Sequence, residues 1–367
     1  MDGQSATSRQ QVTVIAEAGV NHNGDIDLAL ALVEAAQDAG ADVVKFQTFT
    51  AESIVRPSAP KADYQRRTTS VEESQFDMLK GLELSFEDHF RLVKHAQERG
   101  IEFLSTPFDR PSLRFLVYEL KLARIKLPSS DLCNLPLLID AARTGAALIL
   151  STGMASLGEV EQSLKAVTFG CARTGLPSGQ ADLDEAYSDP QARAMLADRL
   201  VLLHCTSDYP ASIDDVNLRA MSTLASAFGL RVGYSDHTQG IAVALAAVAL
   251  GACVIEKHLT LDNTMSGPDH VASSEPAEFA ALVSGIRDVE RAMGSTTKTP
   301  SPTELQNRRT MRKGLYAARG VSAGAVITEA DLEVVRPLSL EGPESYYEWI
   351  GQAAPRSYAA GDEITWT

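Results

Sequence analysis

Short apolar runs alternate with amphipathic stretches along residues 12–293 of the chain. Each apolar run predicts a buried strand, and the stretch after it carries apolar positions at helical spacing. Three of the helical stretches end at a glycine (Gly40, Gly100 and Gly145), the residue that most often follows a helix. The predicted strands cover residues 12–16, 42–47, 101–106, 123–127, 147–151, 200–204, 231–235 and 253–256.

Eight units of strand followed by helix predict one parallel sheet that is covered by helices. With short turns in most units, the pattern favours a (β/α)8 barrel, the TIM barrel, over an open doubly wound sheet. A dinucleotide-binding fold is the alternative, but no GxGxxG motif follows the first predicted strand. The sequence therefore predicts an α/β protein whose larger domain, residues 1–293, is a (β/α)8 barrel.

Two long segments interrupt this rhythm. Residues 50–85 form a polar connection after the second strand, at the place where the lid of a barrel active site would lie. Residues 170–198 are rich in Gly, Asp, Ala and Pro, and they predict an excursion over the surface.

The composition changes after residue 293, where the barrel pattern ends. Residues 294–307 include the run GSTTKTPSP and predict a linker. Residues 308–367 carry short β-like runs separated by Gly and Pro, which predict a small β-rich second domain. A core this small is marginal by itself, so we expect the domain to dock on another surface.

Net charge and cysteine usage restrict the partners and the compartment. The chain has 33 Lys and Arg residues against 48 Asp and Glu residues, a net charge of -15, which argues against nucleic acid and anionic membranes as partners. No stretch has the pattern of a secretion signal, and the longest apolar run, residues 241–250, is too short to cross a bilayer. Four scattered cysteines predict reduced thiols and a cytoplasmic location.

Polar groups gather at the ends of the predicted strands, whereas the strand beginnings are apolar or small. In a (β/α)8 barrel the active site lies at the C-terminal ends of the strands, so this asymmetry favours an enzyme. The groups at these ends are Glu17, Lys45, Gln47, Thr106, Lys126, Ser129, Ser151, His204, Asp236, His237, Glu256 and His258.

Two of these groups are lysines inside apolar runs, Lys45 and Lys126. Either each reaches water from the edge of the barrel, or both point into one pocket. The hydroxyls of Thr106, Ser129 and Ser151 would add donors to such a pocket. Two ammonium groups with several hydroxyls make a site for a phosphate or a carboxylate.

Two histidines, His204 and His237, end the sixth and seventh strands, which are neighbours in a barrel. They predict a site for one divalent metal ion, and the alternative is a pair of core histidines bonded to the backbone. Asp236 would then orient His237, and His258 is a further candidate. We interpret Cys205, on the opposite side of the strand from His204, as core packing.

Several long motifs occur in a fixed order along the chain. The sequence resembles the sialic acid synthase family over nearly its whole length, and residues 315–337 resemble that family's C-terminal antifreeze-like (SAF) domain. The motifs that carry the resemblance are residues 15–24 (IAEAGVNHNG), 43–48 (VVKFQT), 105–107 (STP), 151–154 (STGM), 203–206 (LHCT) and 235–238 (SDHT).

The resemblance implies a transferase that condenses phosphoenolpyruvate (PEP) with an N-acyl-mannosamine-type sugar to a nine-carbon 2-keto acid and releases phosphate. It implies a divalent metal ion, Mn²⁺ or Mg²⁺, held by His204 and His237, and catalytic roles for these residues and Glu17. It further implies a domain-swapped homodimer in which the antifreeze-like domain caps the partner's barrel. By similarity, PEP would be held by Lys45, Thr106, Lys126, Ser129 and Ser151, and the sugar by Gln47, Asp131 and Lys313.

Departures from the family pattern leave the identity of the sugar open. The run Lys126-Leu-Pro-Ser-Ser-Asp131 replaces the family's frequent Lys-Ile-Gly-Ser-Gly-Glu, and Lys313 stands where an arginine is common. Residues 63–65 and 78–84 look more like the bacterial legionaminic acid synthases. Further alternatives are a sugar-phosphate synthase that uses Arg66, Arg67 and Lys313, a metal-dependent aldolase, and a non-catalytic sugar-binding barrel.

Overall fold

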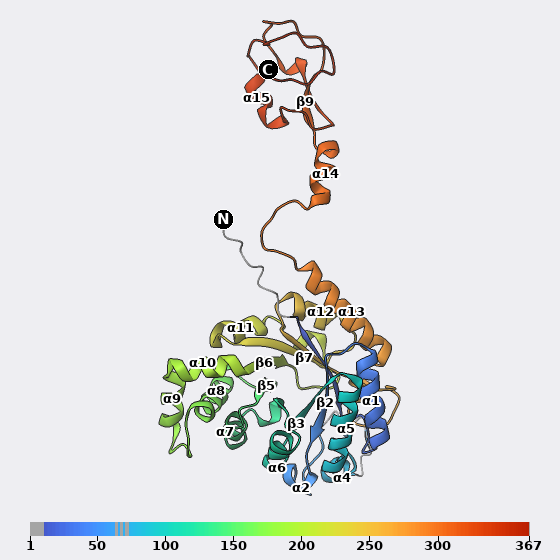
Figure 1. Cartoon of the computed structure of the whole chain (residues 1–367), viewed down its shortest axis with the longest axis vertical. Helices are drawn as coiled ribbons and strands as arrows, with labels where there is room; N and C mark the ends of the chain where they lie inside the picture. Colours follow the sequence, from blue (N-terminus) through green and yellow to red (C-terminus); the bar gives the residue numbers. More distant parts are fainter. Residues whose placement is uncertain (1–10, 63–64, 67–68, 70–72, 367) are drawn as a thin grey trace. The chain divides into compact units, whose positions relative to one another are not determined.

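The computed structural model describes residues 11–62, 65–66, 69 and 73–366. It divides into two compact units, Met1–Gly294 and Ser295–Thr367, which we describe separately. Among the described residues of the first unit, eight parallel strands form one sheet in the order β3-β2-β1-β8-β7-β6-β5-β4 (Figure 1). The strands are β1 (Thr13–Gly19), β2 (Val43–Thr48), β3 (Glu102–Pro107), β4 (Arg124–Leu127), β5 (Ala147–Ser151), β6 (Leu200–Cys205), β7 (Arg231–Asp236) and β8 (Val254–His258).

The first and last strands of this order, β3 and β4, lie next to each other, so the sheet is a nearly closed barrel. Helices follow the strands in turn and cover the outside, which confirms the predicted (β/α)8 architecture (Figure 1). The covering helices are α1 (Ile26–Asp38), α5 (Phe86–Arg99), α6 (Arg110–Arg114), α7 (Leu135–Arg143), α8 (Leu157–Ala172), α11 (Ala220–Phe228), α12 (Ala242–Ala249) and α13 (Pro276–Ala292).

Local sequence signals set the ends of these helices. In α5, the Ser85 hydroxyl accepts a hydrogen bond from the Asp88 amide, and the Asp88 carboxylate accepts one from the Ser85 amide. The helix ends at Gly100, whose φ of 74° lies in the left-handed region that glycine adopts without strain. Ser156 and Glu159 form the same reciprocal cap at the start of α8.

The barrel has two apolar layers, because alternate residues of each strand point to opposite faces. Most of the apolar core lies between the strands and the surrounding helices. The interior of the barrel is filled by a smaller cluster, which consists of Ile15, Val43, Leu104, Ile149, Val201, Leu203 and Val254. The next inward-facing positions along the strands lie at the C-terminal end of the barrel.

The predicted lid connection carries two short helices, α2 (Ala51–Ile54) and α4 (Gln75–Gly81). Asp63, Tyr64 and Arg67, which the sequence analysis singled out, lie outside the described residues. The second long segment differs from a simple excursion, since it forms α9 (Gln180–Ser188) and α10 (Pro190–Arg199), which both pack against α8. Burial of Leu183, Ala186, Ala192 and Leu196 explains why this Ala-containing segment folds.

The second unit contains the antiparallel pair β9 (Gly314–Ala317) and β10 (Leu332–Val335) and the short helix α15 (Tyr346–Trp349). Its core consists of Leu315, Ala317, Val321, Ile327, Leu332, Trp349, Ala354, Tyr358 and Ile364. A further helix, α14 (Pro302–Met311), begins inside the segment predicted as a linker. The signals for it are Ser301 and Glu304, which cap each other, and Pro302 at the first helical position.

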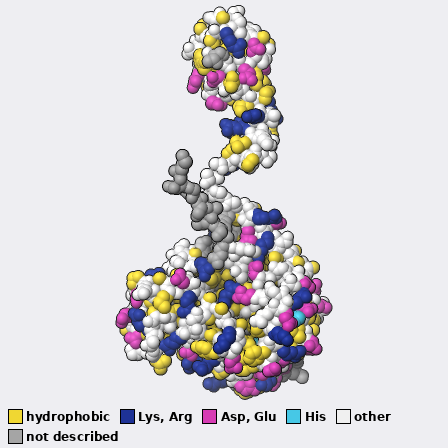
Figure 2. Space-filling view, in the orientation of Figure 1, with side chains coloured by type: hydrophobic (Ala, Val, Ile, Leu, Met, Phe, Trp, Pro, Cys, Tyr) yellow, Lys and Arg dark blue, Asp and Glu magenta, His cyan; other side chains and the backbone are white. Residues whose placement is uncertain are grey.

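In Figure 2, acidic and basic side chains are intermixed over the visible face of the first unit. Among the described residues, no helix is both long and apolar enough to cross a membrane.

Candidate active site

A cavity of about 790 Å³ opens at the C-terminal ends of the barrel strands. Its lining comes from the ends of β1 to β8, from the loops that follow them, and from α2 and α4. Most of the predicted site residues line it, namely Glu17, Lys45, Gln47, Thr106, Lys126, Ser129, Asp131, Ser151 and His237. His204 is the predicted residue of the first unit that is not among the lining residues, and Lys313 belongs to the second unit.

Two lysines and two glutamates form a buried cluster at the floor of the cavity. The Lys45 ammonium lies 2.7 Å from Glu17 Oε2 and 3.5 Å from Glu256 Oε2, and the Lys126 ammonium lies 3.4 Å from Glu256 Oε1. Glu256 Oε1 also accepts a hydrogen bond from the Ser235 hydroxyl at 2.8 Å. Lys45 and Lys126 therefore share this carboxylate, and both point into the same pocket.

The pKa values of the two carboxyl groups in the cluster are shifted in opposite directions. Burial opposes the ionisation of Glu256, but Lys126 and Lys45 outweigh it and hold the pKa of this carboxyl below its ordinary value. In Glu17 burial dominates over the attraction of Lys45, so its pKa is raised. Burial lowers and the two glutamates raise the pKa of Lys45, and the net shift is upward. When Glu17 is protonated, two ammonium groups face one ionised carboxylate, and the floor then favours an additional anion.

Hydroxyl groups surround this floor. Thr106 Oγ1 accepts a hydrogen bond from Lys45 at 3.2 Å, and Ser129 Oγ accepts one from the Gly153 amide at 2.9 Å. The buried Ser151 hydroxyl has no hydrogen-bond partner within the described part of the chain. A side chain at Gly153 would stand 2.9 Å from Ser129 Oγ, so only glycine leaves this space open. The arrangement suits an anion that offers several oxygen acceptors.

His204 lies outside the cavity, and the predicted pairing of His204 with His237 is wrong. Its Nε2 lies 2.6 Å from the carbonyl oxygen of Val216, and its ring packs 5.9 Å from that of Tyr234. Because Leu203 belongs to the interior cluster, its neighbour His204 must point outward toward the helices. Cys205 then points inward and lines the cavity, which also corrects its interpretation as core packing.

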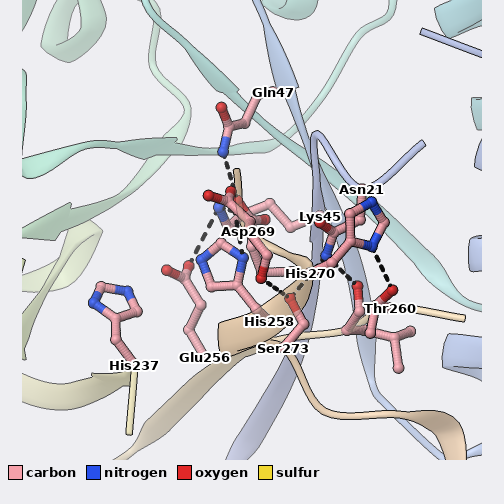
Figure 3. A network of polar contacts seen from close by, with 12 residues as sticks. Asn21, Lys45, Gln47, His237, Glu256, His258, Thr260, Asp269, His270 and Ser273 are labelled. Atoms are coloured by element: carbon pink, nitrogen blue, oxygen red, sulfur yellow. Dashed lines mark hydrogen bonds and ion pairs between the residues drawn. The ribbon is translucent and has the colours of Figure 1, made fainter. Parts of the chain in front are cut away.

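His237 and His258 are the two imidazoles that line the cavity together, with ring centroids 5.6 Å apart (Figure 3). His237 Nδ1 donates a hydrogen bond to the Thr206 carbonyl at 2.6 Å, which leaves Nε2 with a lone pair. Burial lowers the pKa of His237 to about 4 and that of His258 well below its ordinary value. Both rings are therefore neutral at pH 7, the form that binds metals.

A divalent metal ion fits this pair. His258 Nδ1 is buried and has no hydrogen-bond partner among the residues that the structure describes. In the described ranges, no group of three or more His, Cys, Asp or Glu side chains is arranged around one point as a metal site. Two imidazoles would therefore hold an ion whose other ligands are water and substrate oxygens.

Asp236 does not orient His237 as predicted. It points to the outer face of the barrel, where its carboxylate lies 3.0 Å from the Lys257 ammonium and accepts hydrogen bonds from the amide and the hydroxyl of Thr238. The carboxylate thus stabilises the turn after β7. Strand alternation explains this result, because Asp236 is one residue from the inward-facing Ser235 and His237.

A loop after β8 brings a second carboxylate, Asp269, into the cavity. The Asp269 carbonyl accepts a hydrogen bond from the Ser273 hydroxyl at 2.7 Å, and this hydroxyl accepts one from the Asn21 amide at 2.8 Å (Figure 3). Burial, with a contribution from Glu17, raises the pKa of Asp269 to about 7. Asp269 can therefore exchange a proton near neutral pH.

The remaining predicted sugar residues lie in different places. Gln47 donates a hydrogen bond from Nε2 to Glu17 Oε1 at 3.1 Å. Asp131 accepts one from the Asn134 side chain at 2.8 Å, and burial raises the pKa of its carboxyl. Lys313 is exposed in the second unit, two residues after α14 ends.

Family models match most of the chain: the NeuB family model covers residues 32–298, and the SAF domain model covers residues 312–367. The chain belongs to the NeuB family. It is 45% identical to the N,N'-diacetyllegionaminic acid synthase of Campylobacter jejuni over 355 residues, which cover 97% of this chain and 99% of that protein. It is also 45% identical to the N,N'-diacetyllegionaminic acid synthase of Legionella pneumophila over 353 residues, 96% of this chain and 93% of that protein.

Solved structures include a similar chain, the N-acetylneuraminic acid (sialic acid) synthetase of Leptospira borgpetersenii, crystallised with citrate. The likeness has a TM-score of 0.64 at 34% identity and covers 81% of this chain and 90% of that one. The antifreeze-like domain expected from residues 315–337 is confirmed by the SAF match.

The structure of this NeuB-family chain adds functional candidates that the sequence analysis missed or left aside. Glu256 and His258 are two residues apart on β8, so their shared face could have been found from the strand period. Tyr209, whose ring centroid lies 4.2 Å from that of His237, and Asp269 lie in loops, where no period indicates direction.

Proposed function

We propose that this chain is a nonulosonic acid synthase of the legionaminic acid type. Its substrates would be PEP and the open-chain form of 2,4-diacetamido-2,4,6-trideoxymannose. A bond forms between C3 of PEP and the aldehyde carbon, water adds at C2 of PEP, and phosphate leaves with cleavage of the C2–O bond. The observation that carries the proposal is 45% identity, over nearly full length, to two N,N'-diacetyllegionaminic acid synthases.

The floor of the cavity supports binding of PEP. Lys45 and Lys126 would neutralise its carboxylate and phosphate, which are the two anionic groups of this substrate. Glu256 holds the two ammonium groups toward the same space, because its ionised carboxylate lies 3.5 Å from Lys45 and 3.4 Å from Lys126. Ser129 would donate a hydrogen bond to a phosphate oxygen, and so would the Ser151 hydroxyl, which has no hydrogen-bond partner among the described residues.

His237 and His258 would hold a divalent ion, Mn²⁺ or Mg²⁺, beside this anion site. The bound ion would act as a Lewis acid on the aldehyde oxygen of the sugar. Asp269, with its pKa of about 7, would donate a proton to this oxygen, which then becomes a hydroxyl group. Glu17 and Gln47, joined by a hydrogen bond at 3.1 Å, would contact sugar hydroxyls.

The second unit has a part in the same proposal. We infer a domain-swapped homodimer in which the SAF domain of one protomer covers the cavity of its partner and Lys313 contacts the N-acyl group. Support comes from the resemblance to the family and from the small core of this unit, which would gain stability by docking on a second surface. The free thiols of Cys133, Cys171, Cys205 and Cys253 support a cytoplasmic location.

Release of inorganic phosphate from PEP tests the proposed function. With Mn²⁺ and the full chain, we expect release that depends on 2,4-diacetamido-2,4,6-trideoxymannose and is weaker with N-acetylmannosamine. Removal of residues 295–367 should raise KM for the sugar if the SAF domain covers the site. A metal-dependent aldolase or a non-catalytic barrel would release no phosphate with either sugar, and that result would reject the proposal.

A further inference from the structure

One sector of the cavity lining is apolar, and the residues assigned to PEP, metal and proton transfer leave it unused. We call it the apolar wall and define it as Val20, Phe49, Ile54, Met78, Leu79 and Leu82. The four most buried members, Val20, Phe49, Met78 and Leu82, are only 4–7% exposed, so they pack on one another as well as facing the cavity. The wall is therefore a built surface, and its shape is set by mutual packing.

The apolar wall and the reacting groups come from different parts of the barrel rim. Val20 and Phe49 follow β1 and β2, and the other members belong to α2 or α4 or, in the case of Leu82, directly follow α4, whereas His237 and His258 come from the ends of β7 and β8. The aldehyde carbon of the sugar must lie near these imidazoles and the anion floor. The other end of the sugar, which carries C6, then extends to a different sector of the lining.

Two lysines of the connection that carries α2 and α4 are paired with carboxylates. Lys61 lies 2.8 Å from the Glu73 carboxylate and donates a hydrogen bond to the Thr69 hydroxyl at 2.9 Å. Lys80, on α4, forms ion pairs with Glu52 at 2.9 Å and Glu83 at 3.1 Å. Both lysines are thus engaged with carboxylates, which favours an uncharged group over a phosphate on the sugar at this wall.

We propose that the apolar wall selects acceptor sugars that carry a methyl group at C6, and discriminates against a hydroxyl or a phosphate there. This inference rests on the proposed function. A methyl group buried against Met78 and Leu82 leaves water and gains contact, whereas a hydroxyl there loses hydrogen bonds to water without replacement. Apolar pockets discriminate against one added hydroxyl by about 10- to 100-fold in kcat/KM.

A pair of sugars that differ only at C6 tests the wall. The pair is 2,4-diacetamido-2,4,6-trideoxymannose and 2,4-diacetamido-2,4-dideoxymannose, which has a hydroxyl at C6. Phosphate release from saturating PEP with Mn²⁺ gives kcat/KM for each sugar. We expect the full-length wild type to favour the 6-deoxy sugar by about 10- to 100-fold.

Substitution of a wall residue should reduce this ratio. Met78→Gln keeps the length of the side chain and supplies a hydrogen-bonding amide, so the ratio should fall at least fivefold through a gain for the hydroxyl sugar. Leu79→Gln, at a half-buried position, is the second variant in case Met78→Gln folds poorly. Met154→Gln is the matched control, since Met154 lines the cavity from the loop after β5 and is 73% exposed.

The outcomes separate the two levels of the argument. Equal kcat/KM for both sugars in the wild type overturns the role of the wall and leaves the proposed function standing. A fall of the ratio in Met154→Gln that equals the fall in Met78→Gln also overturns it, because the effect would then not belong to the wall. Absence of phosphate release with either sugar counts against the proposed function itself.

Discussion

Glu256→Gln is the substitution that most directly tests the buried charge cluster. In the wild type, the Glu256 carboxylate lies 3.5 Å from the Lys45 ammonium and 3.4 Å from the Lys126 ammonium, and its side chain is 3% exposed. Glutamine has nearly the same shape but no charge. Lys45 keeps Glu17 at 2.7 Å, whereas Lys126 loses the carboxylate that balances it.

The expected loss of stability follows from these distances. At an effective dielectric constant of about 20, each ammonium–carboxylate contact is worth roughly 5 kcal/mol of attraction. The desolvation of Glu256 offsets part of this attraction. Removing one partner of a buried ion pair by substitution costs about 3–5 kcal/mol of stability. A change of this size is a large part of the stability of a typical domain, about 5–15 kcal/mol.

Urea unfolding with and without inorganic phosphate measures the effect. We expect Glu256→Gln to lose about 3–5 kcal/mol, and phosphate to restore more stability in the variant than in the wild type, because an anion replaces the missing charge. Glu102→Gln is the control, since Glu102 lies 2.6 Å from Arg124 in a partly exposed pair that is worth at most about 1 kcal/mol. Equal losses in the two variants, with no added response to phosphate, would refute the reasoning.

Two further predictions concern the metal pair and the loop carboxylate. His258→Ala should weaken binding of Mn²⁺ at least tenfold in a calorimetric titration, and His204→Asn should leave it unchanged, since His258 lines the cavity and His204 does not; the reverse result would restore His204 as the ligand. Asp269 has a folded-state pKa of about 7 against an ordinary value of 3.8, so its contribution to stability is present below about pH 4 and is lost as the pH rises to about 7. In metal-free protein, the difference in free energy of unfolding between Asp269→Asn and the wild type should therefore shift in favour of the variant between pH 5 and pH 8. A difference that does not change with pH would contradict the raised pKa.

The barrel could be predicted from the sequence because its signal is repeated eight times. Each strand is an apolar run and most helices are amphipathic, so an error at one boundary leaves the architecture unchanged. The helices α9 and α10 were missed because Gly, Asp and Pro recur in the segment between α8 and β6, although its Leu183, Ala186, Ala192 and Leu196 have helical spacing. The helix α14 was missed within a polar segment, although Ser301 and Glu304 mark its start.

The residue types of the site were predictable from the strand ends, but the side of the strand to which His204 points was predicted wrongly. Lys45, Lys126, Thr106, Ser129 and Ser151 reach the cavity because the end of a barrel strand is the site for any enzyme of this fold. His204 was chosen for its residue type and its place at a strand end. Val201 and Leu203 of β6 fill the barrel interior, so His204, which follows Leu203, points to the outer side of the strand.

The pairing of neighbouring strands turns this single observation into a rule for the whole site. In a parallel sheet, paired residues of adjacent strands point to the same side. Lys45 pairs with Glu17 and Glu17 with His258, so one inward lysine implies an inward carboxylate and an inward imidazole.

The same rule holds for the strands that carry the other histidines. Cys205 pairs with Ser235, and Ser235 with Glu256, which places these three side chains on the cavity side. Ser235 precedes His237, and Glu256 precedes His258, by two residues along the chain. His204 pairs instead with Tyr234, whose ring belongs to the outer core. The strand period thus selects His237 and His258 from the histidines at the strand ends, and it does so from the register of the sheet, before any metal chemistry is considered.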